Sequence, residues 1–597
     1  MAKKKVAEAE TIGLDPNAPR PRLKRLVIRN FRAIGSNPVE IELDDIVVLV
    51  GPNNVGKSSI LRAYEVVMQH GSKLGKLTTF DFPNGLIDNE LIPEIIVETV
   101  VFDEKAPGEQ WIIRDSISGE MSVKEKWTYP APGADPKKVG WDVAKNDWHE
   151  TSGPWGTANV AQAARPEPHR IEAFARPEEQ AEEIIKLLTA ALKGRIEVLR
   201  ATERADDEEK NKFQALQDSL IAIQKEIAAE AQAEIDNVQN DLTKIVGAVF
   251  PGHKVVFDPK IEEEPKVNFF GSSPELRMGP EGGFQPAVEH QGSGARRTLL
   301  WAAIRILSEQ KRALENKNQG RPHVLLIDEP ELCLHPNAVR DARDVLYDLP
   351  STGNWQVMVT THSPVFIDLS RDNTSIIRVE KTSTGEVQGT TLFRPKRAQL
   401  DVGDRARLKL LNLFDPYVAE FFFGGRVIIV EGDTEYTALK HVIASAKDEY
   451  ADIHIIRARG KATIVSMCKI LNQFGTPYAV LHDCDVPTVR TKAGEERSNG
   501  AWTLNQRIRD VMQDAIDLGR ARLVASVTNF ERAYFGEEAV GEKPYNALEK
   551  MSTSDDTFRT VAQLLKALTN RDHDLPPNAV EWSSLSQLED AVASHTN

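Results

Sequence analysis

Two stretches of the sequence carry residues whose types and spacing could do chemistry. Residues 46–64 read IVVLVGPNNVGKSSILRAY, and residues 427–439 read VIIVEGDTEYTAL. Each has the pattern of a strand that runs into a helix. The first stretch places glycines, a lysine and serines at the turn, which are the groups that hold a phosphate. The second places carboxylates there, which are the groups that hold a hard divalent cation.

The first stretch fits the phosphate-loop pattern G-x-x-x-x-G-K-[ST] in full. Its glycines let backbone N–H groups curl around a phosphate, and the start of the next helix adds a positive dipole end. Lys57 is expected to reach the β- and γ-phosphates of ATP, and the Ser58 hydroxyl to bind the accompanying Mg²⁺. The residues predicted to contact ATP here are Gly51, Asn53, Asn54, Gly56, Lys57, Ser58 and Ser59.

A phosphate loop needs a second anchor for Mg²⁺ at the end of a neighbouring strand. The sequence VLLIDEPELCLHP begins at Val324, and four apolar residues precede its first acid, as in a central parallel strand. Asp328 is predicted to hold Mg²⁺ through water, and Glu329 to polarise the attacking water. A buried strand that ends in a solvated turn is the alternative, but it does not easily explain two adjacent acids followed by Pro330.

Two further elements follow the phosphate loop along the chain. Residues 291–294, QGSG, open a helical pattern, and Ser293 and Gly294 are candidate ATP contacts; the alternative is an ordinary helix cap. His362 follows the strand pattern WQVMVT and could sense a γ-phosphate, or it is a surface histidine. The order of these elements resembles the ABC-type ATPase head of SMC and RecF-like proteins. That resemblance implies a head dimer in which the Gly-Ser-Gly element of one copy caps ATP on another. No secure equivalent of the glutamine loop of those heads is present.

The second stretch has a companion downstream. Glu431 and Glu435 form E-G-x-x-E, and Asp483 and Asp485 follow another strand pattern, YAVLH. Residues i and i+2 of an extended chain point the same way, so both aspartates are expected to aim at one spot. Ligands of open α/β sheets bind at strand carboxyl ends, and oxygen-only ligands favour Mg²⁺ or Mn²⁺. The pair of motifs resembles the Toprim domain; a solvated turn is the alternative.

Two later residues extend this site. Glu531 follows the strand pattern RLVASV and could complete a second metal site, or it is an exposed helix-start glutamate. Lys543 precedes Pro544 at a helix start, where a cation could stabilise a pentavalent phosphate transition state, or it is a solvent-exposed lysine. An ATPase head with a helical insert and a C-terminal Toprim domain resembles the OLD-family nucleases, and its length and insert resemble the stand-alone class.

The OLD-family resemblance implies a two-metal nuclease centre at Glu431, Glu435, Asp483, Asp485, Glu531 and Lys543, with Glu431 and Lys543 in the cutting chemistry. It implies two Mg²⁺ or Mn²⁺ ions per Toprim site and a third with ATP. Family roles lie in phage defence and DNA handling. We expect ATP binding between heads to license DNA cleavage, with an accessory or trigger protein left open.

Two other functions compete with this interpretation. The first is an ATP-driven DNA-binding clamp of the SMC/RecF-like kind, whose Toprim unit is only structural. The second is a topoisomerase, which needs a nucleophilic tyrosine. Tyr436 and Tyr478 are available, but both fall within regular elements close to the metal motifs.

The 597 residues are too many for one core. The predicted order is a disordered lead (1–20), an ATPase head in two parts (21–170 and 248–395) around a helical insert (171–247), a connector (396–423) and a doubly wound α/β Toprim domain (424–597). Between Phe213 and Ile245 apolar residues recur at steps of three and four, a heptad pattern with one stutter. Such a helix either packs on its own domain or pairs with a second copy as a dimerisation arm.

Composition narrows the class. The hydrophobic fraction of 41% and charged fraction of 27% are those of a globular protein, and neither a membrane span nor a secretory signal is predicted. Three cysteines, Cys333, Cys468 and Cys484, suit neither a disulfide framework nor a zinc site, so the cytoplasm is the expected compartment. A net charge of −15 argues against a protein that coats DNA nonspecifically, but permits a DNA enzyme with acids gathered around metal ions.

Overall fold

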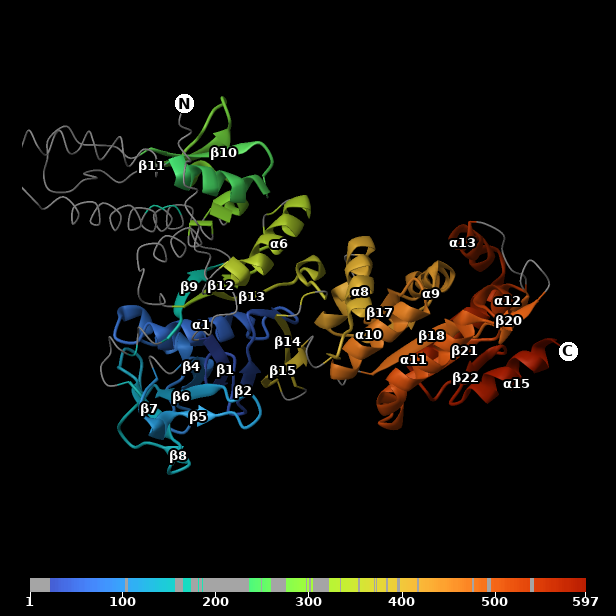
Figure 1. Ribbon diagram of the computed structural model, residues 1–597, viewed down its shortest axis with the longest axis horizontal. Coiled ribbons are helices and arrows are strands. Elements are labelled where there is room, and N and C mark those ends of the chain that lie inside the picture. The colour runs from blue at the N-terminus through green and yellow to red at the C-terminus, as the bar shows by residue number, and fades with distance from the viewer. Residues whose placement is uncertain are drawn as a thin grey trace, which may run out of the picture. The chain divides into compact units, whose positions relative to one another are not determined.

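The structure, a computed structural model, describes the chain except residues 1–21, 173–180, 186–235, 259–274, 304–321 and gaps of five residues or fewer. It divides into two compact units (Figure 1). The first comprises residues 1–49, 54–361 and 379–389, and the second 50–53, 362–378 and 390–597. The predicted disordered lead, and residues 186–235 of the predicted insert, lie outside the described residues.

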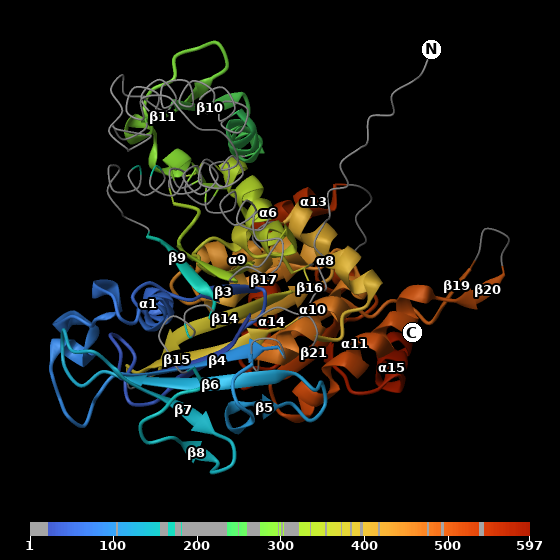
Figure 2. The same cartoon turned by 60° about the vertical axis from the view of Figure 1, so that its left-hand side comes forward.

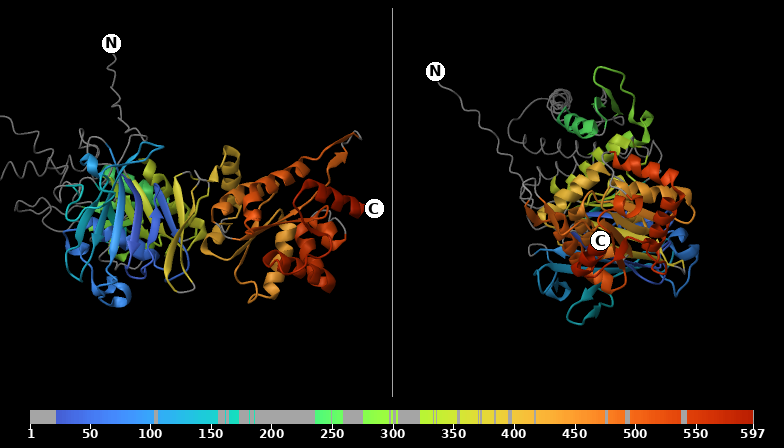
Figure 3. Two further views of the ribbon diagram at one scale, coloured as in Figure 1. Left: turned by 90° about the horizontal axis from the view of Figure 1, so that it is seen from below. Right: turned by 90° about the vertical axis from the view of Figure 1, so that its right-hand side faces the viewer.

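An antiparallel sheet forms one layer of the first unit. Its order is β2-β1-β4-β6-β7-β8, with β5 paired to β6, and β1, β2, β4 and β6 run side by side in blue in Figures 1 and 3. The strands are β1 (Arg22–Arg29), β2 (Val39–Glu42), β4 (Glu94–Val101), β5 (Ile113–Arg114), β6 (Met121–Thr128), β7 (Lys137–Asp142) and β8 (Asp147–Trp148).

A second sheet, of order β15-β14-β3-β13-β12-β9, contains the strands that were predicted to carry the ATP residues. Its members are β3 (Ile46–Val50), β9 (Glu167–Ile171), β12 (His323–Asp328), β13 (Trp355–Thr360), β14 (Thr374–Lys381) and β15 (Val387–Phe393). The order β3-β13-β12-β9 is parallel throughout. Because helices cover parallel sheets, β3, β12 and β13 are buried along their whole length, which explains their continuous apolar runs. Helices α1 (Lys57–Met68) and α6 (Pro336–Thr352) follow β3 and β12.

The described end of the predicted insert packs on its own unit. A helix covers residues 236–248, with Val238, Leu242 and Val246 buried. The Thr243 hydroxyl accepts a hydrogen bond of 3.1 Å from the N–H of Val255 in β10 (His253–Asp258), which pairs with β11 (Glu275–Pro280). Val246 takes the inward position that the heptad pattern gave to Ile245. Of the two predicted alternatives, this end of the insert therefore follows the first: the helix packs on its own domain.

The second unit contains a five-stranded sheet of order β17-β16-β18-β21-β22. Its first four strands are parallel and β22 is antiparallel. The strands are β16 (Arg426–Val430), β17 (Ile453–Arg457), β18 (Tyr478–Asp483), β21 (Ala521–Ser526) and β22 (Ala579–Glu581). The helices are α8 (Val402–Phe414), α9 (Asp433–Ser445), α10 (Lys461–Phe474), α11 (Gly500–Asp517), α12 (Phe530–Phe535), α13 (Lys543–Thr553), α14 (Asp555–Thr569) and α15 (Leu585–Thr596), with the 3-10 helix η8 (Val418–Phe423).

Helices cover both faces of this sheet. Ala479 and Leu481 of β18 join an apolar cluster with residues of α9 and α14. Tyr478, on the opposite face, donates a hydrogen bond of 2.7 Å to Asn472 of α10. A ribbon of β19 (Thr488–Arg490) and β20 (Glu496–Ser498) stands out beside α11 in Figure 2. Among the described helices, none is long and apolar enough to cross a membrane.

Candidate ATP site and metal centre

The phosphate loop joins a buried strand to a helix, as its sequence predicts. Gly56 precedes α1 with a φ of 94°, a left-handed conformation that favours glycine, and Asn54 is also left-handed, with a φ of 60°. Lys57 and Ser58 therefore begin the helix, where backbone N–H groups point toward an approaching anion. The local backbone suits the anion-binding turn that the sequence predicts.

Two residues that are 270 positions apart meet at the expected Mg²⁺ position. The Ser58 hydroxyl donates a hydrogen bond of 3.0 Å to Asp328, the last residue of β12. Asp328 also accepts a hydrogen bond from the Thr360 hydroxyl and pairs with Arg170 at 3.3 Å. A hydroxyl and a carboxylate side by side provide the oxygen donors that Mg²⁺ prefers.

Lys57 lies among acids. Lys57 is only 6% exposed, and this burial lowers the pKa of its amine to about 8. The negative charges of Glu329, Asp328 and Glu331 raise that pKa and so oppose the effect of burial. A bound phosphate would add negative charge beside the amine and favour its protonated form. The arrangement therefore suits a lysine that binds phosphate.

Glu329 has a backbone conformation that is costly outside glycine. Its φ is 47°, and its N–H donates to the Thr360 carbonyl oxygen at 3.1 Å. Strain of this kind persists where the surroundings impose it, and functional residues often show it. It turns the chain out of the sheet directly after Asp328.

The remaining predicted ATP residues stay predictions. A helical segment begins at Ser293, and Thr298 donates to the Gly294 carbonyl oxygen at 2.9 Å, so the Gly-Ser-Gly element does open a helix. His362 lies two residues beyond the end of β13, whose last residue, Thr360, is paired with Asp328.

Four predicted metal ligands converge in the second unit. Glu431 follows β16, Asp483 ends β18, and these strands are neighbours. The Glu431 carboxylate accepts a hydrogen bond of 3.2 Å from the N–H of Asp483. Glu435 and Glu531 lie in the first turns of α9 and α12 and are 4% and 3% exposed.

Burial and mutual repulsion raise the pKa values of two of these carboxylates. Loss of hydration raises the pKa of Asp483 well above its usual range, and Glu435, Glu431 and Glu531 raise it further. Burial likewise raises the pKa of Glu435 to about 7, with Glu431 and Glu531 adding to the shift. Because four acids that repel one another are costly to gather, a cation bound among them would offset the repulsion. Their all-oxygen donor set fits Mg²⁺ or Mn²⁺.

Asp485 does not point where the extended-chain reasoning placed it. Strand β18 ends at Asp483, and Asp485 has a left-handed backbone, with a φ of 60°. Its carboxylate pairs with Lys461, at the start of α10. The geometric reason for expecting Asp483 and Asp485 to aim at one spot is therefore wrong. Asp485 remains close enough to raise the pKa of Asp483.

Glu531 and Lys543 lie together beside this cluster. The Lys543 amine is 3.1 Å from a Glu531 carboxylate oxygen, which also accepts a hydrogen bond of 2.8 Å from Thr434. The Lys543 side chain is 49% exposed, so it can reach a substrate in solvent as well as Glu531. The structure thus brings a half-exposed cation to the edge of the carboxylates.

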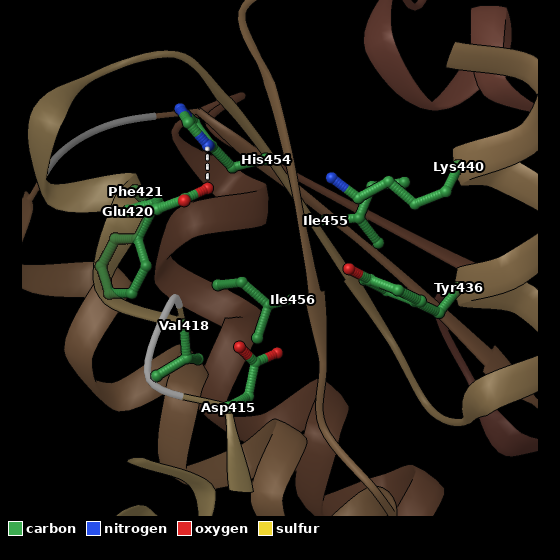
Figure 4. A pocket seen from close by; sticks show the side chains of 9 residues that line it. All are labelled: Asp415, Val418, Glu420, Phe421, Tyr436, Lys440, His454, Ile455 and Ile456. Atoms are coloured by element: carbon green, nitrogen blue, oxygen red, sulfur yellow. Dashed lines mark ion pairs between the residues drawn. The ribbon is translucent and has the colours of Figure 1, made fainter. Parts of the chain in front are cut away.

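Neither tyrosine considered for a topoisomerase is placed as a nucleophile at the carboxylates. Tyr478 begins β18, at the other end of the strand from Asp483, and its hydroxyl binds Asn472. Tyr436 lines a separate pocket of about 280 Å³ with Lys440 and His454 (Figure 4). The Tyr436 ring also faces the Arg457 guanidinium, 5.0 Å from its centroid.

Sequence reasoning missed several residues that the structure adds to these sites. Arg170 and Thr360 bind Asp328, and Lys461 binds Asp485. Lys461 follows Gly460 at a strand-to-helix turn, a weak signal for a site residue. Arg170 lies in β9, and only the pairing of β9 with β12 brings it to Asp328.

Replacing Glu435 should stabilise the metal-free protein. Its folded-state pKa is raised from 4.5 to about 7, so ionisation destabilises the folded state as pH rises through this range, and the loss persists above it. Glu435→Gln should therefore raise the free energy of unfolding in chelator at pH 8, by up to roughly 3 kcal/mol, and by little near pH 4.5. Denaturant unfolding at both pH values measures this.

The exposed Glu549→Gln in the same unit is the matched control and should change neither value. Added Mg²⁺ should then stabilise the parent more than Glu435→Gln. If Glu435→Gln is the less stable protein in chelator at pH 8, the carboxylates do not repel one another as described.

Two family models match the parts of the chain that contain these two candidate sites. The family described as the AAA ATPase domain matches residues 22–119 and 167–367. The family described as the overcoming lysogenization defect protein-like TOPRIM domain matches residues 422–485. The first match contains Lys57 and Asp328, and the second contains Glu431, Glu435 and Asp483. The predicted fold class, an α/β ATPase head followed by a Toprim domain, is confirmed.

Two curated relatives are similar over most of the chain. The OLD nuclease of Thermus scotoductus is 25% identical over 586 residues, covering 92% of this chain and 99% of the relative. The Old nuclease of Escherichia phage P2 is 24% identical over 528 residues, covering 85% of each. Among solved structures, the Smc head domain with an extended coiled coil from Pyrococcus furiosus matches with 16% identity and a TM-score of 0.38, covering 62% of this chain and 96% of that one.

Proposed function

We propose that the chain, which belongs to the OLD family, is an ATP-hydrolysing, metal-dependent DNA endonuclease. That family joins an AAA ATPase domain to a TOPRIM domain. The observation that carries the nuclease half is the convergence of Glu431, Glu435, Asp483 and Glu531, in which burial raises the pKa values of the first three. The two curated relatives are named nucleases, which supports the same chemistry.

The carboxylates would bind two Mg²⁺ or Mn²⁺ ions, with Asp483 placed centrally between Glu431 and the start of α12. Bound there, such ions lower the pKa of a water and neutralise the leaving 3′ oxygen of DNA. Lys543 would leave Glu531 and face the charge that develops on the phosphate; its half-exposed side chain beside Glu531 supports that role. Asp485 would bind a metal ion only if its ion pair with Lys461 were broken.

Four residues of the first unit would carry ATP binding and hydrolysis. Lys57 binds the phosphates, Ser58 and Asp328 hold the ATP-bound Mg²⁺, and Glu329 orients the attacking water. We propose that ATP binding licenses cleavage, that the enzyme is of the stand-alone class, and that it serves phage defence or DNA processing in the cytoplasm. An accessory protein could trigger DNA cleavage.

Plasmid cleavage tests this proposal most directly. Purified protein incubated with supercoiled plasmid and Mg²⁺ or Mn²⁺ should produce nicked and then linear DNA, and chelator should stop the reaction. The pairing of Lys543 with Glu531 and of Lys461 with Asp485 gives the clamp alternative one supporting observation, because lysines neutralise two of the acids. Metal-independent DNA binding without cleavage would favour that clamp.

We propose a homodimer through the ATPase heads, in which Ser293 of one copy caps ATP on the other. Glu329→Gln should retain ATP, and its mass by light scattering should double when ATP is added. Ser293→Arg in the same background should suppress that doubling, while the exposed Ser586→Arg should not. A mass that depends on neither ATP nor Ser293 would place the interface elsewhere.

A further inference from the structure

Four side chains gather where three parallel strands begin. Glu167, His323 and Trp355 are the first residues of β9, β12 and β13, and the pairing of the strands sets them side by side. His169 lies two residues beyond Glu167, so it points to the same face of β9. Asp328 and Thr360 end β12 and β13, so this group lies at the opposite end of the sheet from the candidate ATP site.

The donor atoms of three of these side chains converge. Nε2 of His169 lies 3.0 Å from Nδ1 of His323, and Oε2 of Glu167 lies 3.8 Å from the same Nδ1. All three ligand atoms lie within 4.8 Å of one another. The Trp355 ring stacks on His323, with centroids 4.9 Å apart, and covers the pair on one side.

Two imidazole nitrogens and one carboxylate oxygen are a ligand set of zinc sites. At zinc–nitrogen distances of about 2.0–2.1 Å, a tetrahedral site holds its two nitrogens about 3.3 Å apart. The observed 3.0 Å needs only a small side-chain rotation to reach that spacing. The alternative is a hydrogen bond without metal, in which the ring N–H of one histidine donates to the ring nitrogen of the other.

We propose that Glu167, His169 and His323 bind a Zn²⁺ ion, with water in the fourth position. The ion would join β9 to β12. Strand β9 is five residues long, lies at the edge of its sheet and carries Arg170, which pairs with Asp328. Zinc here is a structural clip that holds Arg170 in line with the ATP-site aspartate. The Toprim carboxylates, with oxygen donors alone, select a different class of ion.

Zinc retention by the full-length chain tests this site. Protein stripped with chelator is loaded with Zn²⁺ in excess Mg²⁺, passed through a desalting column, and analysed for zinc per chain. The parent should retain one equivalent that His323→Gln and His169→Gln lose. Two variants should retain it: His573→Gln, which removes an exposed histidine of the other unit, and Asp483→Asn, which alters the Toprim site.

Two further measurements keep the result independent of folding. Co²⁺ in place of Zn²⁺ should give visible absorption bands of a tetrahedral site in the parent, in His573→Gln and in Asp483→Asn, but not in His323→Gln or His169→Gln. Glu167→Gln changes a side chain that is 35% exposed, so it should fold, and it should weaken Zn²⁺ binding because an amide oxygen carries no charge to bind the ion. If the parent holds no zinc, or if His323→Gln and Glu167→Gln hold as much as the parent, the two histidines are only hydrogen bonded and the proposal is wrong.

Discussion

Asp483→Asn should reduce DNA cleavage by at least about 10²-fold while ATP hydrolysis stays at the parental rate. Asp483 is surrounded by Glu431, Glu435 and Glu531, so its carboxylate is the one best placed to be shared between two ions. Its Oδ1 also accepts a hydrogen bond of 2.8 Å from the N–H of Phe530, at the start of α12. An asparagine oxygen can keep that bond, so the variant removes charge and preserves the helix start.

Plasmid nicking on gels measures the effect, with ATPase activity assayed on the same preparations. The exposed Asp572→Asn is the control and should cut like the parent. Lys543→Ala separates metal binding from chemistry: it removes no metal ligand, so Mg²⁺ binding should persist while cleavage slows about 10²–10³-fold. Parental cleavage by Asp483→Asn, with unchanged metal dependence, would leave the clamp as the better explanation of the Toprim unit.

Lys57→Met should reduce ATP hydrolysis by at least about 10²-fold. Lys57 is the buried cation of the phosphate loop, with Asp328, Glu329 and Glu331 near it. Methionine keeps most of the apolar stem that packs in the site but brings no charge to the phosphates. Phosphate release measures turnover, and binding of a fluorescent ATP analogue shows whether affinity falls too. The exposed Lys73→Met, in a 3-10 helix that follows α1, is the matched control.

Glu329→Gln gives the contrasting outcome in the same site. Its amide keeps the size of the side chain but cannot polarise water as a carboxylate does, so ATP should bind and persist. Comparing plasmid cleavage by Glu329→Gln and Lys57→Met then shows whether bound ATP licenses cutting. Normal ATP hydrolysis by Lys57→Met would show that the phosphate loop is not part of the ATP site.

Much of both sites could be predicted because their residues lie where a strand becomes a helix. The motif at Lys57 and Ser58, and the E-G-x-x-E at Glu431 and Glu435, have short spacings that local backbone geometry controls. The apolar runs before Asp328 and Asp483 likewise predicted buried parallel strands, and these are β12 and β18. The extended-chain argument did not hold at Asp485, because that residue is left-handed and lies beyond the end of the strand, with its carboxylate paired to Lys461.

The sequence by itself determined which residue types could bind phosphate and metal, since chain-adjacent groups keep their spacing in any fold that forms the strand and helix. Only the tertiary structure decided which distant groups meet them. Strand pairing brings Arg170 to Asp328 and sets Glu167 beside His323, and the start of α12 brings Glu531 toward Asp483. The raised pKa values follow from that convergence. They depend on burial and on the distances between charges, which one-dimensional spacing does not contain.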